Sequence, residues 1–305
     1  MYVRSRSNRK PPTTARMACP ARPATAVLVV PMRRFAAAIP LALGLLVAAC
    51  APTILPMKPG TSFRDCPECP EMIVAPAGSF MMGASASAAE GMTGGARRHV
   101  RWESERPRHT VTINRPFALG TFTVTRGDYA AFVRETGYGD IEACYRWNGR
   151  RLALALGTDW RDPGFAQTDR DPVVCVSWHD ARAYAYWLSR KTGKRYRLLS
   201  EAEWEYVARS ETMTTADARA RPNGFGVYGM IGGVGEWLRD CWHDTYDGAP
   251  SDGGVWTAKG RCDDRVLRGA SPYSGPRRSH PSSRGRFNPF LRSVDIGFRV
   301  ARTLP

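Results

Sequence analysis

The sequence predicts an α+β fold that is loop-rich and low in regular secondary structure. Three helix starts fall in the first two thirds of the chain, whereas glycines and short β-like runs dominate beyond Gly224. No helix longer than two turns is expected after about Arg239. All nine tryptophans lie between Trp102 and Trp256, and 43% of the residues are apolar, so the chain can build a sizeable core.

Each predicted helix begins at a hydroxyl residue that is followed three positions later by an acid. This spacing is the capping box or its aspartate variant, in which the hydroxyl accepts from free amide donors of the first turn. The three pairs are Thr125–Asp128, Ser177–Asp180 and Ser200–Glu203. Apolar residues then recur every three or four positions, and a glycine follows each of the first two helices, at 137 and 193.

Alternating apolar residues predict strands on both sides of a long loop. The run MIVAPAGSF, which begins at Met72, is typical of two strands joined by a turn. The run HTVTINRPFAL, from His109, alternates as a third strand does. Between them, residues 84–98 are rich in Ala, Ser and Gly, which indicates a loop.

The first 49 residues indicate export. They carry eight basic residues and no acidic one, and Arg33 and Arg34 precede a short apolar run from Phe35 to Ala49. That run is too short to span a membrane, and Val-Ala-Ala-Cys at its end predicts acylation at Cys50. An ordinary secreted protein that is cut nearby is the alternative.

This interpretation divides the chain into three parts. Residues 1–49 are an N-terminal extension with a signal peptide, residues 50–70 a lipidated tether, and residues 71–305 the folded domain. The expected location is the periplasmic side of a bacterial membrane, with the lipid anchor as one partner of the protein.

The net charge does not indicate a nucleic-acid-binding protein. It falls from +16 to +8 without the first 49 residues, and no Lys/Arg stripe with interleaved aromatics is present. Attraction to anionic lipid or glycan remains open.

The cysteine count agrees with an oxidising compartment. Of eight cysteines, Cys19 lies in the discarded part and Cys50 carries the lipid. The six that remain predict disulfides; they are Cys66, Cys69, Cys144, Cys175, Cys241 and Cys262. We favour the pairs Cys144–Cys175 and Cys241–Cys262. The Cys66-x-x-Cys69 pair is interpreted as a small structural disulfide, rather than a redox motif or half of a zinc site.

Several long motifs resemble one family. These are MIVAPAGSFMMG, ERPRHTVTINRPFALGTFTVTRGDYAAF, PVVCVSWHDARAYAYWLSRKTGKRYRLLSEAEWEYVARS, RVLRGAS and IGFRVAR. In this order they resemble the formylglycine-generating enzyme, or sulfatase-modifying factor, family from about Met72 to Arg302. The resemblance implies a C-type-lectin-like α+β fold. It also implies an oxidase that converts a sulfatase cysteine to Cα-formylglycine with copper, dioxygen and a thiol reductant.

The copper positions implied by the resemblance are serines here. The family's two cysteines follow an Arg-Gly-Gly-Ser motif, which is Arg268-Gly269-Ala270-Ser271 in this chain, and they fall on Ser274 and Ser279. Cu(I) is soft and prefers thiolate or thioether ligands, so hydroxyls cannot replace them. We therefore expect no copper.

The family's calcium region is also altered. Where relatives carry an acid, an amide and a tryptophan, this chain has glycines at 229, 233 and 235. Glu236 alone cannot supply the several oxygens that calcium requires. We expect a weak or absent calcium site and no bound cofactor.

The segment that would line the family groove is rich in arginine. The candidate groove residues are Arg268, Ser271, Arg277, Arg278, His280 and Arg284. Arginine suits a peptide carboxylate or an anionic glycan, although it also binds backbone carbonyls in loop-rich folds. A Ser–His nucleophile pair at His280 would lack an orienting acid. None of the five histidines forms an H-x-H or H-x3-H pair, so an iron site is not expected.

Two functions follow from these patterns. The favoured one is a non-catalytic binding or envelope-assembly module, that is, a pseudoenzyme of the family. The alternative is an oxidoreductase that forms Cα-formylglycine, or a related product, with non-standard ligands.

Overall fold

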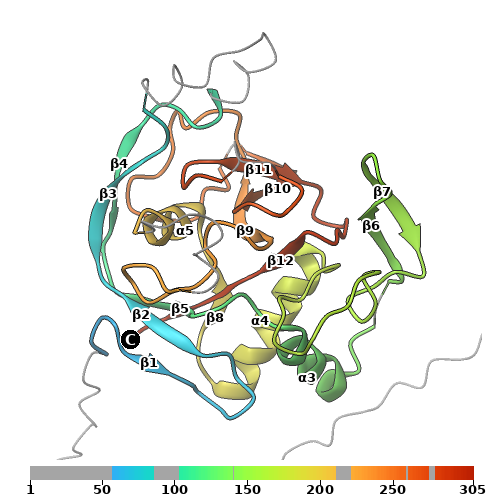
Figure 1. Cartoon of the computed structure of the whole chain (residues 1–305). Helices are drawn as coiled ribbons and strands as arrows, with labels where there is room; N and C mark the ends of the chain where they lie inside the picture. Colours follow the sequence, from blue (N-terminus) through green and yellow to red (C-terminus); the bar gives the residue numbers. More distant parts are fainter. Residues whose placement is uncertain (1–56, 86–102, 140, 211–220, 259, 275–278) are drawn as a thin grey trace, which may run out of the picture. The chain divides into compact units, whose positions relative to one another are not determined.

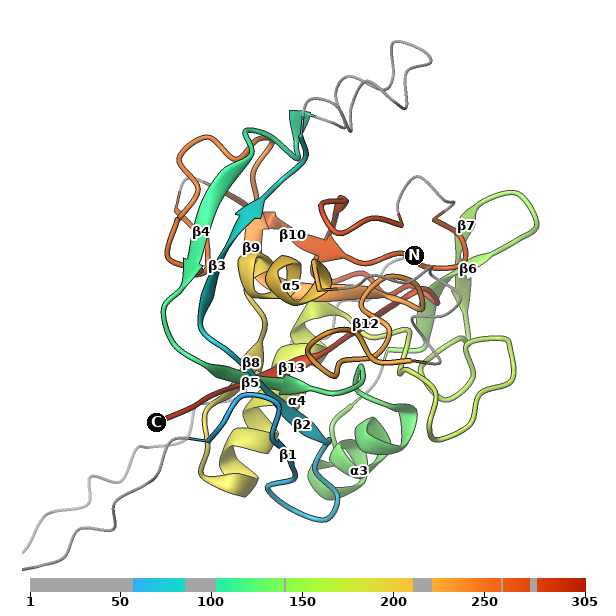
Figure 2. The same ribbon diagram turned by 60° about the vertical axis from the view of Figure 1, so that its left-hand side comes forward.

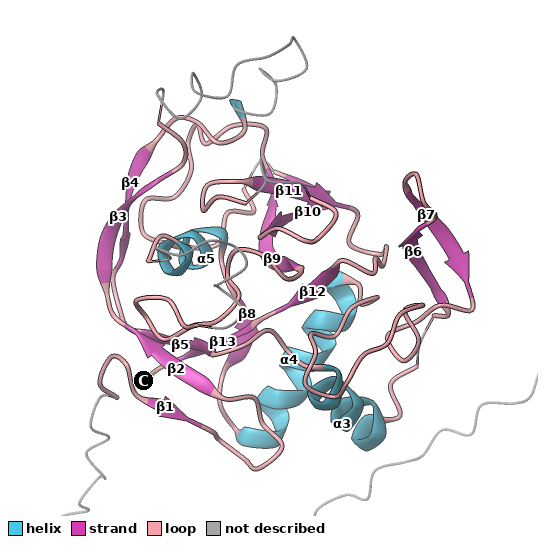
Figure 3. Cartoon of the chain, in the orientation of Figure 1, coloured by secondary structure: helices cyan, strands magenta, loops and turns pink. Residues whose placement is uncertain are grey.

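The computed structural model describes residues 57–85, 103–139, 141–210, 221–258, 260–274 and 279–305 (Figure 1). Within them, three helices and thirteen mostly short strands are joined by long loops, as Figure 3 shows by colour. The predicted loop-rich α+β class is confirmed. None of the helices in these ranges is long and apolar enough to cross a membrane.

A five-stranded antiparallel sheet joins the two ends of the domain. Its strands, in spatial order, are β1 (Ser62–Phe63), β2 (Met72–Ala75), β5 (Phe117–Gly120), β13 (Val300–Thr303) and β8 (Tyr196–Leu198). The last strand of the chain therefore lies between β5 and β8.

The domain begins earlier than the predicted boundary at residue 71. Strand β1 lies inside the predicted tether of residues 50–70 and pairs with β2, with Ser62 opposite Ile73. The amide of Gly60 also donates to the Val74 carbonyl at 2.8 Å. A two-residue strand is too short to show apolar alternation, so the sequence pattern could not reveal it.

A second sheet carries Arg268 and Arg284, two of the residues predicted to line the groove. Its order is β11 (Arg284–Phe287), β10 (Arg261–Arg268), β9 (Gly235–Trp242) and β12 (Ile296–Phe298). Strand β12 runs parallel to β9, and the other neighbours are antiparallel.

Two hairpins complete the strands. In Figure 2, β3 (Gly78–Met82) and β4 (His109–Ile113) extend the ribbon of β2 and β5. The hairpin of β6 (Ala143–Trp147) and β7 (Leu152–Leu156) stands apart from both sheets.

All three predicted helices form, each with its capping box. They are α3 (Arg126–Thr136), α4 (Trp178–Thr192) and α5 (Glu201–Ala208). Gly137 and Gly193 follow the first two with φ of 65° and 67°, a left-handed conformation that glycine adopts without steric cost.

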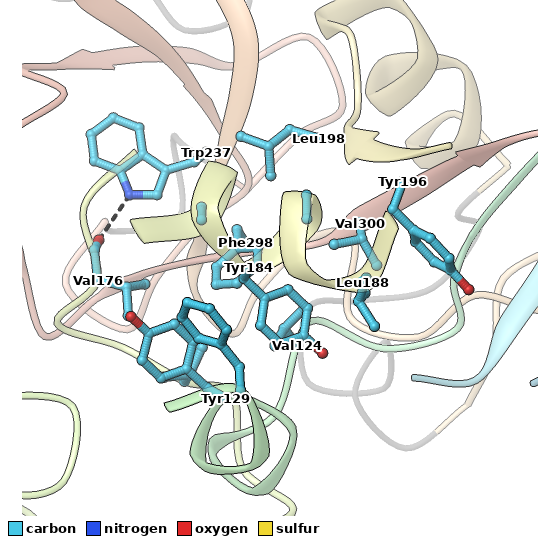
Figure 4. Packing of buried hydrophobic residues seen from close by; sticks show 14 of the residues in the cluster. Val124, Tyr129, Val176, Tyr184, Leu188, Tyr196, Leu198, Trp237, Phe298 and Val300 are labelled. Atoms are coloured by element: carbon cyan, nitrogen blue, oxygen red, sulfur yellow. Dashed lines mark hydrogen bonds between the residues drawn. The ribbon is translucent and has the colours of Figure 1, made fainter. Parts of the chain in front are cut away.

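Large aromatic side chains fill the core between the helices and the sheets (Figure 4). Tyr129 of α3, Tyr184 of α4 and Phe298 of β12 are almost fully buried and pack on one another. The indole of Trp237 donates to the Val176 carbonyl at 2.9 Å, which satisfies its polar atom inside the core.

The three expected disulfides are present. Cys144–Cys175 ties the β6–β7 hairpin to the segment before α4, and Cys241–Cys262 links β9 to β10. The third, Cys66–Cys69, closes a turn between β1 and β2, which agrees with its interpretation as a small structural bridge.

Candidate functional site

Arg268 at the end of β10 anchors the segment that was predicted to line a groove. Its side chain is fully buried and forms an ion pair with Glu205 of α5. It also donates to the carbonyls of Ser282 and Ser283, each at 2.8 Å. One guanidinium therefore links the end of β10 to Ser282 and Ser283, which directly precede β11.

Arg284 is a second buried anchor. It donates to Glu201 through Nε at 2.6 Å and through Nη2 at 3.0 Å, and its Cζ lies 4.2 Å from the centroid of the Tyr246 ring. Burial alone would raise the pKa of Glu201, but Arg284 and Arg268 together lower it below its usual value.

The prediction that Arg268 and Arg284 line a groove is wrong. Both side chains have no exposed surface, because a loop-rich fold leaves carbonyls and carboxylates inside that need a cationic donor. Arg277 and Arg278 lie outside the described residues.

Ser274, the first family copper position, belongs to a closed hydrogen-bond network. The amide of Ser271 donates to Ser274 Oγ at 2.9 Å, and the two hydroxyl oxygens are 3.1 Å apart. Ser271 Oγ donates to Asp295 Oδ2 at 2.9 Å, and Ser293 Oγ donates to the other oxygen of Asp295 at 2.5 Å. We call these four residues the Ser271–Asp295 network.

The donor set at this position does not fit Cu(I). The Ser274 hydroxyl is engaged with the amide and the hydroxyl of Ser271, and the second copper position is another hard hydroxyl, Ser279. Across the described part of the chain, no group of three or more His, Cys, Asp or Glu side chains is placed to hold a metal ion.

The calcium region does not fit its ion either. The carboxylate of Glu236 receives Arg299 Nη2 on one oxygen at 2.9 Å and Trp204 Nε1 on the other at 3.1 Å. The neighbouring glycines bring no side-chain oxygen. Glu236 is therefore a partner of Arg299 in the core.

His280 lies beside an acid that sequence reasoning missed. Its Nδ1 is 3.1 Å from Ser282 Oγ, which donates to Glu105 Oε2 at 3.0 Å. In a nucleophilic triad the acid would contact the other ring nitrogen and the serine would donate to histidine. Here the serine donates to the acid, so the arrangement does not prepare a nucleophile. No local pattern links Glu105 to a residue 177 positions away.

An exposed aromatic pair, also missed by sequence reasoning, borders the network. Trp147 of β6 and Tyr273 stack with ring centroids 5.5 Å apart and an interplanar angle of 16°. They are 43% and 44% exposed. Tyr273 lies between two members of the network, and its amide donates to Ser271 Oγ at 3.2 Å. We call Trp147 and Tyr273 the aromatic platform.

Three contacts position the platform. The amide of Tyr145 in β6 donates to the Arg292 carbonyl at 2.8 Å, and the amide of Val294 donates to the Tyr145 carbonyl at 2.9 Å. The Cys144–Cys175 disulfide attaches the same strand to the segment before α4. The hairpin is thereby held next to the segment that carries Ser293.

Comparison with known proteins identifies the family. The sulfatase-modifying factor enzyme 1-like domain matches residues 58–219 and 210–304. The chain belongs to this family. The resemblance deduced from the motifs is confirmed, and the match starts near β1, inside the predicted tether.

A relative named as an enzyme and one named as inactive are about equally similar to this chain. The formylglycine-generating enzyme of Streptomyces coelicolor is 30% identical over 269 residues, which cover 65% of this chain and 82% of the relative. The inactive C-alpha-formylglycine-generating enzyme 2 of Mus musculus is 27% identical over 297 residues, which cover 76% and 85%. Membership in the family therefore does not decide whether this chain is catalytic.

A solved structure shares the fold over the whole of its length. PvdO from Pseudomonas aeruginosa is 38% identical, with a TM-score of 0.68, and the match covers 81% of this chain and all of that one. Treponema denticola variable protein 1 is 20% identical with a TM-score of 0.57, which shows the fold alone.

Proposed function

We propose that this chain is a binding or envelope-assembly module of its family and performs no copper oxidase chemistry. The observation that carries the proposal is the Ser271–Asp295 network. The hydroxyl at the first copper position is bonded within the loop, where an oxidase of this family needs a free thiolate.

The aromatic platform supplies a surface for a protein or peptide partner. Tyrosine and tryptophan are enriched at interfaces, since each combines a large apolar face with a polar atom. Two stacked rings that remain more than 40% exposed beside a rigid network can receive an apolar side chain of a partner.

A copper titration tests the loss of chemistry. The purified protein and the Streptomyces coelicolor relative are titrated with Cu(I) against a chromophoric chelator. Both are then incubated in air with a thiol reductant and a Cys-x-Pro-x-Arg peptide. We expect the relative to retain copper and convert the peptide cysteine, and this chain to do neither.

The alternative, an oxidoreductase with non-standard ligands, makes the opposite prediction. Loss of the peptide thiol in a mass spectrum, dependent on this chain and on dioxygen, would overturn the proposed function. Substitution of Ser274 by Ala would then ask whether that position takes part in the reaction.

Export and anchoring form the second part of the proposal, and they rest on the sequence pattern before Cys50. When the full chain is produced in a bacterium with labelled palmitate, we expect label in the wild type and none in Cys50→Ser. The variant should also move from the membrane fraction to the soluble fraction. Equal labelling of both proteins would contradict lipidation at Cys50.

A further inference from the structure

A basic cleft opens where α4 faces β8 and β9. Its volume is about 680 Å³. The residues that matter for the argument are Trp178, Arg182, Tyr186, Arg197, Arg239 and Arg265. None of the residues that line this cleft belongs to the Ser271–Asp295 network or to the aromatic platform.

Among the described residues, only one of the four arginines forms an ion pair with a carboxylate. Arg197 forms two hydrogen bonds with Glu203, at 2.6 Å and 2.7 Å. Within the described residues, Arg182 and Arg239 form no ion pair with any carboxylate. Arg265 donates to the Arg239 carbonyl at 2.8 Å, while its buried Nε has no hydrogen-bond partner in the described part of the chain. Three of the four cations therefore have no carboxylate at ion-pair distance among the described residues, although Asp240 lies close enough to act on Arg239 and Arg265, and Glu203 on Arg239.

The indole of Trp178 orients two of these guanidinium groups. Its ring centroid lies 4.0 Å from Arg265 Cζ and 4.7 Å from Arg182 Cζ. The ring is held by its own hydrogen bond to the Leu238 carbonyl, at 2.7 Å. A fixed aromatic face keeps both cations in place before any ligand arrives, which lowers the entropic cost of binding.

Two of these charges, on Arg239 and Arg265, are also partly withdrawn from water, whereas Arg182 is exposed. Burial lowers the pKa of Arg239, with the neighbouring Arg197 as the next cause, and burial followed by Arg182 lowers the pKa of Arg265. A cation that loses hydration and has no carboxylate in direct contact is destabilising, and a bound anion reduces that penalty.

We propose that this cleft is an anion site for a ligand that carries a phosphate or sulfate group. Guanidinium donors match tetrahedral oxyanions in pairs, and Arg182, Arg239 and Arg265 all line this one cleft. The volume exceeds that of a single phosphate, and Tyr186, which is 66% exposed, borders it, so the ligand has room for a larger attached group. The site is independent of the proposed function.

Calorimetric titration of the purified protein with inorganic pyrophosphate tests the site. The double variant Arg182→Gln/Arg239→Gln removes two cations that make no ion pair with the described carboxylates, so the fold is expected to stay intact. The matched control is Arg150→Gln/Arg151→Gln, two exposed arginines in the β6–β7 turn with the same change in charge. We expect at least about tenfold weaker binding for the cleft variant and none of that loss for the control.

Two results would overturn the site: no binding of pyrophosphate by the wild type at millimolar concentration, or equal losses in both variants. An arm with phosphatidylglycerol vesicles separates two sources of the group. Vesicle binding that is lost in the cleft variant assigns the phosphate to a lipid headgroup. Pyrophosphate binding without vesicle binding assigns it to a soluble ligand.

Discussion

Buried arginines hold backbone carbonyls of separate segments together in this molecule. Arg299 is fully buried, and its guanidinium donates to the carbonyls of Gly120, Thr121 and Tyr228 at 2.8, 3.1 and 2.9 Å while it pairs with Glu236. Thr121 and Tyr228 lie in loops and Gly120 is the last residue of β5, and the five fixed donors of one guanidinium can satisfy several such carbonyls at once.

Removal of one buried partner should therefore be costly. Arg284→Met leaves the carboxylate of Glu201 inside the protein without its bidentate donor. We expect the free energy of unfolding in urea to fall by about 3–5 kcal/mol. Arg126→Met, which breaks the exposed pair with Asp169, should cost about 0–1 kcal/mol. Similar losses in the two variants would contradict this role of Arg284.

The raised pKa of Asp240 predicts that the stability of the fold depends on pH. Burial, and then repulsion from Glu201, raise its pKa to about 7, although the amides of Trp256 and Glu201 donate to it. The folded state therefore keeps a proton between pH 4 and 7 that the unfolded chain releases. Stability from this group is present at pH 4 and is lost as the pH rises through 7, by up to about 1.4 kcal/mol per pH unit.

Urea unfolding of the wild type and Asp240→Asn from pH 4 to 8 measures this contribution. The asparagine variant cannot titrate at this position, so its stability should fall less steeply over that range. Parallel curves for the two proteins would show that Asp240 has an ordinary pKa in the folded state.

At the scale of single residues, the sequence predicts a site position only where a motif allows it to be counted. Ser274 could be placed by counting from Arg268-Gly269-Ala270-Ser271. Glu105 and Trp147 could not, because their partners are far along the chain and the contacts depend on the packing of separate loops. The burial of Arg284 was missed for the same reason.

At the scale of elements, the helix caps are local and carry measurable stability. Ser177 accepts from the amide of Asp180 at 3.1 Å, and the Asp180 side chain accepts from the Ser177 amide at 2.7 Å. We expect Ser177→Ala to cost about 1 kcal/mol and to lower the melting temperature by about 2–4 °C. Ser251→Ala, at an exposed loop position, should change neither. A melting temperature equal to the wild type would show that the cap of α4 is dispensable.

Helices were easier to predict than strands because their signals are contained in one stretch of chain. For α3 and α4, the capping box, the helix and the glycine that follows it all fall within one stretch of fewer than about twenty residues. Strand β12, in contrast, has three residues and pairs in parallel with β9, about sixty positions earlier. The three residues of β12 are too few to show a strand pattern, and pairing with β9 makes them a strand.

At the scale of the whole molecule, long-range links compensate for the small amount of regular structure. Strand β13 closes the five-stranded sheet between β5 and β8, and the Cys144–Cys175 bridge attaches the outlying β6–β7 hairpin. The strand pairing links distant segments in the folded state, and the disulfide in addition restricts the unfolded chain.

The two longer-range disulfides should therefore stabilise the molecule more than the short one. Cys144 and Cys175 are 31 positions apart, and Cys66 and Cys69 only three. In the chain-entropy model, Cys144→Ala/Cys175→Ala should cost about 3–4 kcal/mol, and Cys66→Ala/Cys69→Ala less than about 2 kcal/mol. Calorimetric melting of both variants and of the wild type compares them directly, with dithiothreitol added to the wild type as a third condition. Reduction should lower the melting temperature by several degrees. If the two variants melt together, packing of the hairpin against Ser293 holds it in place, and the bridge adds little.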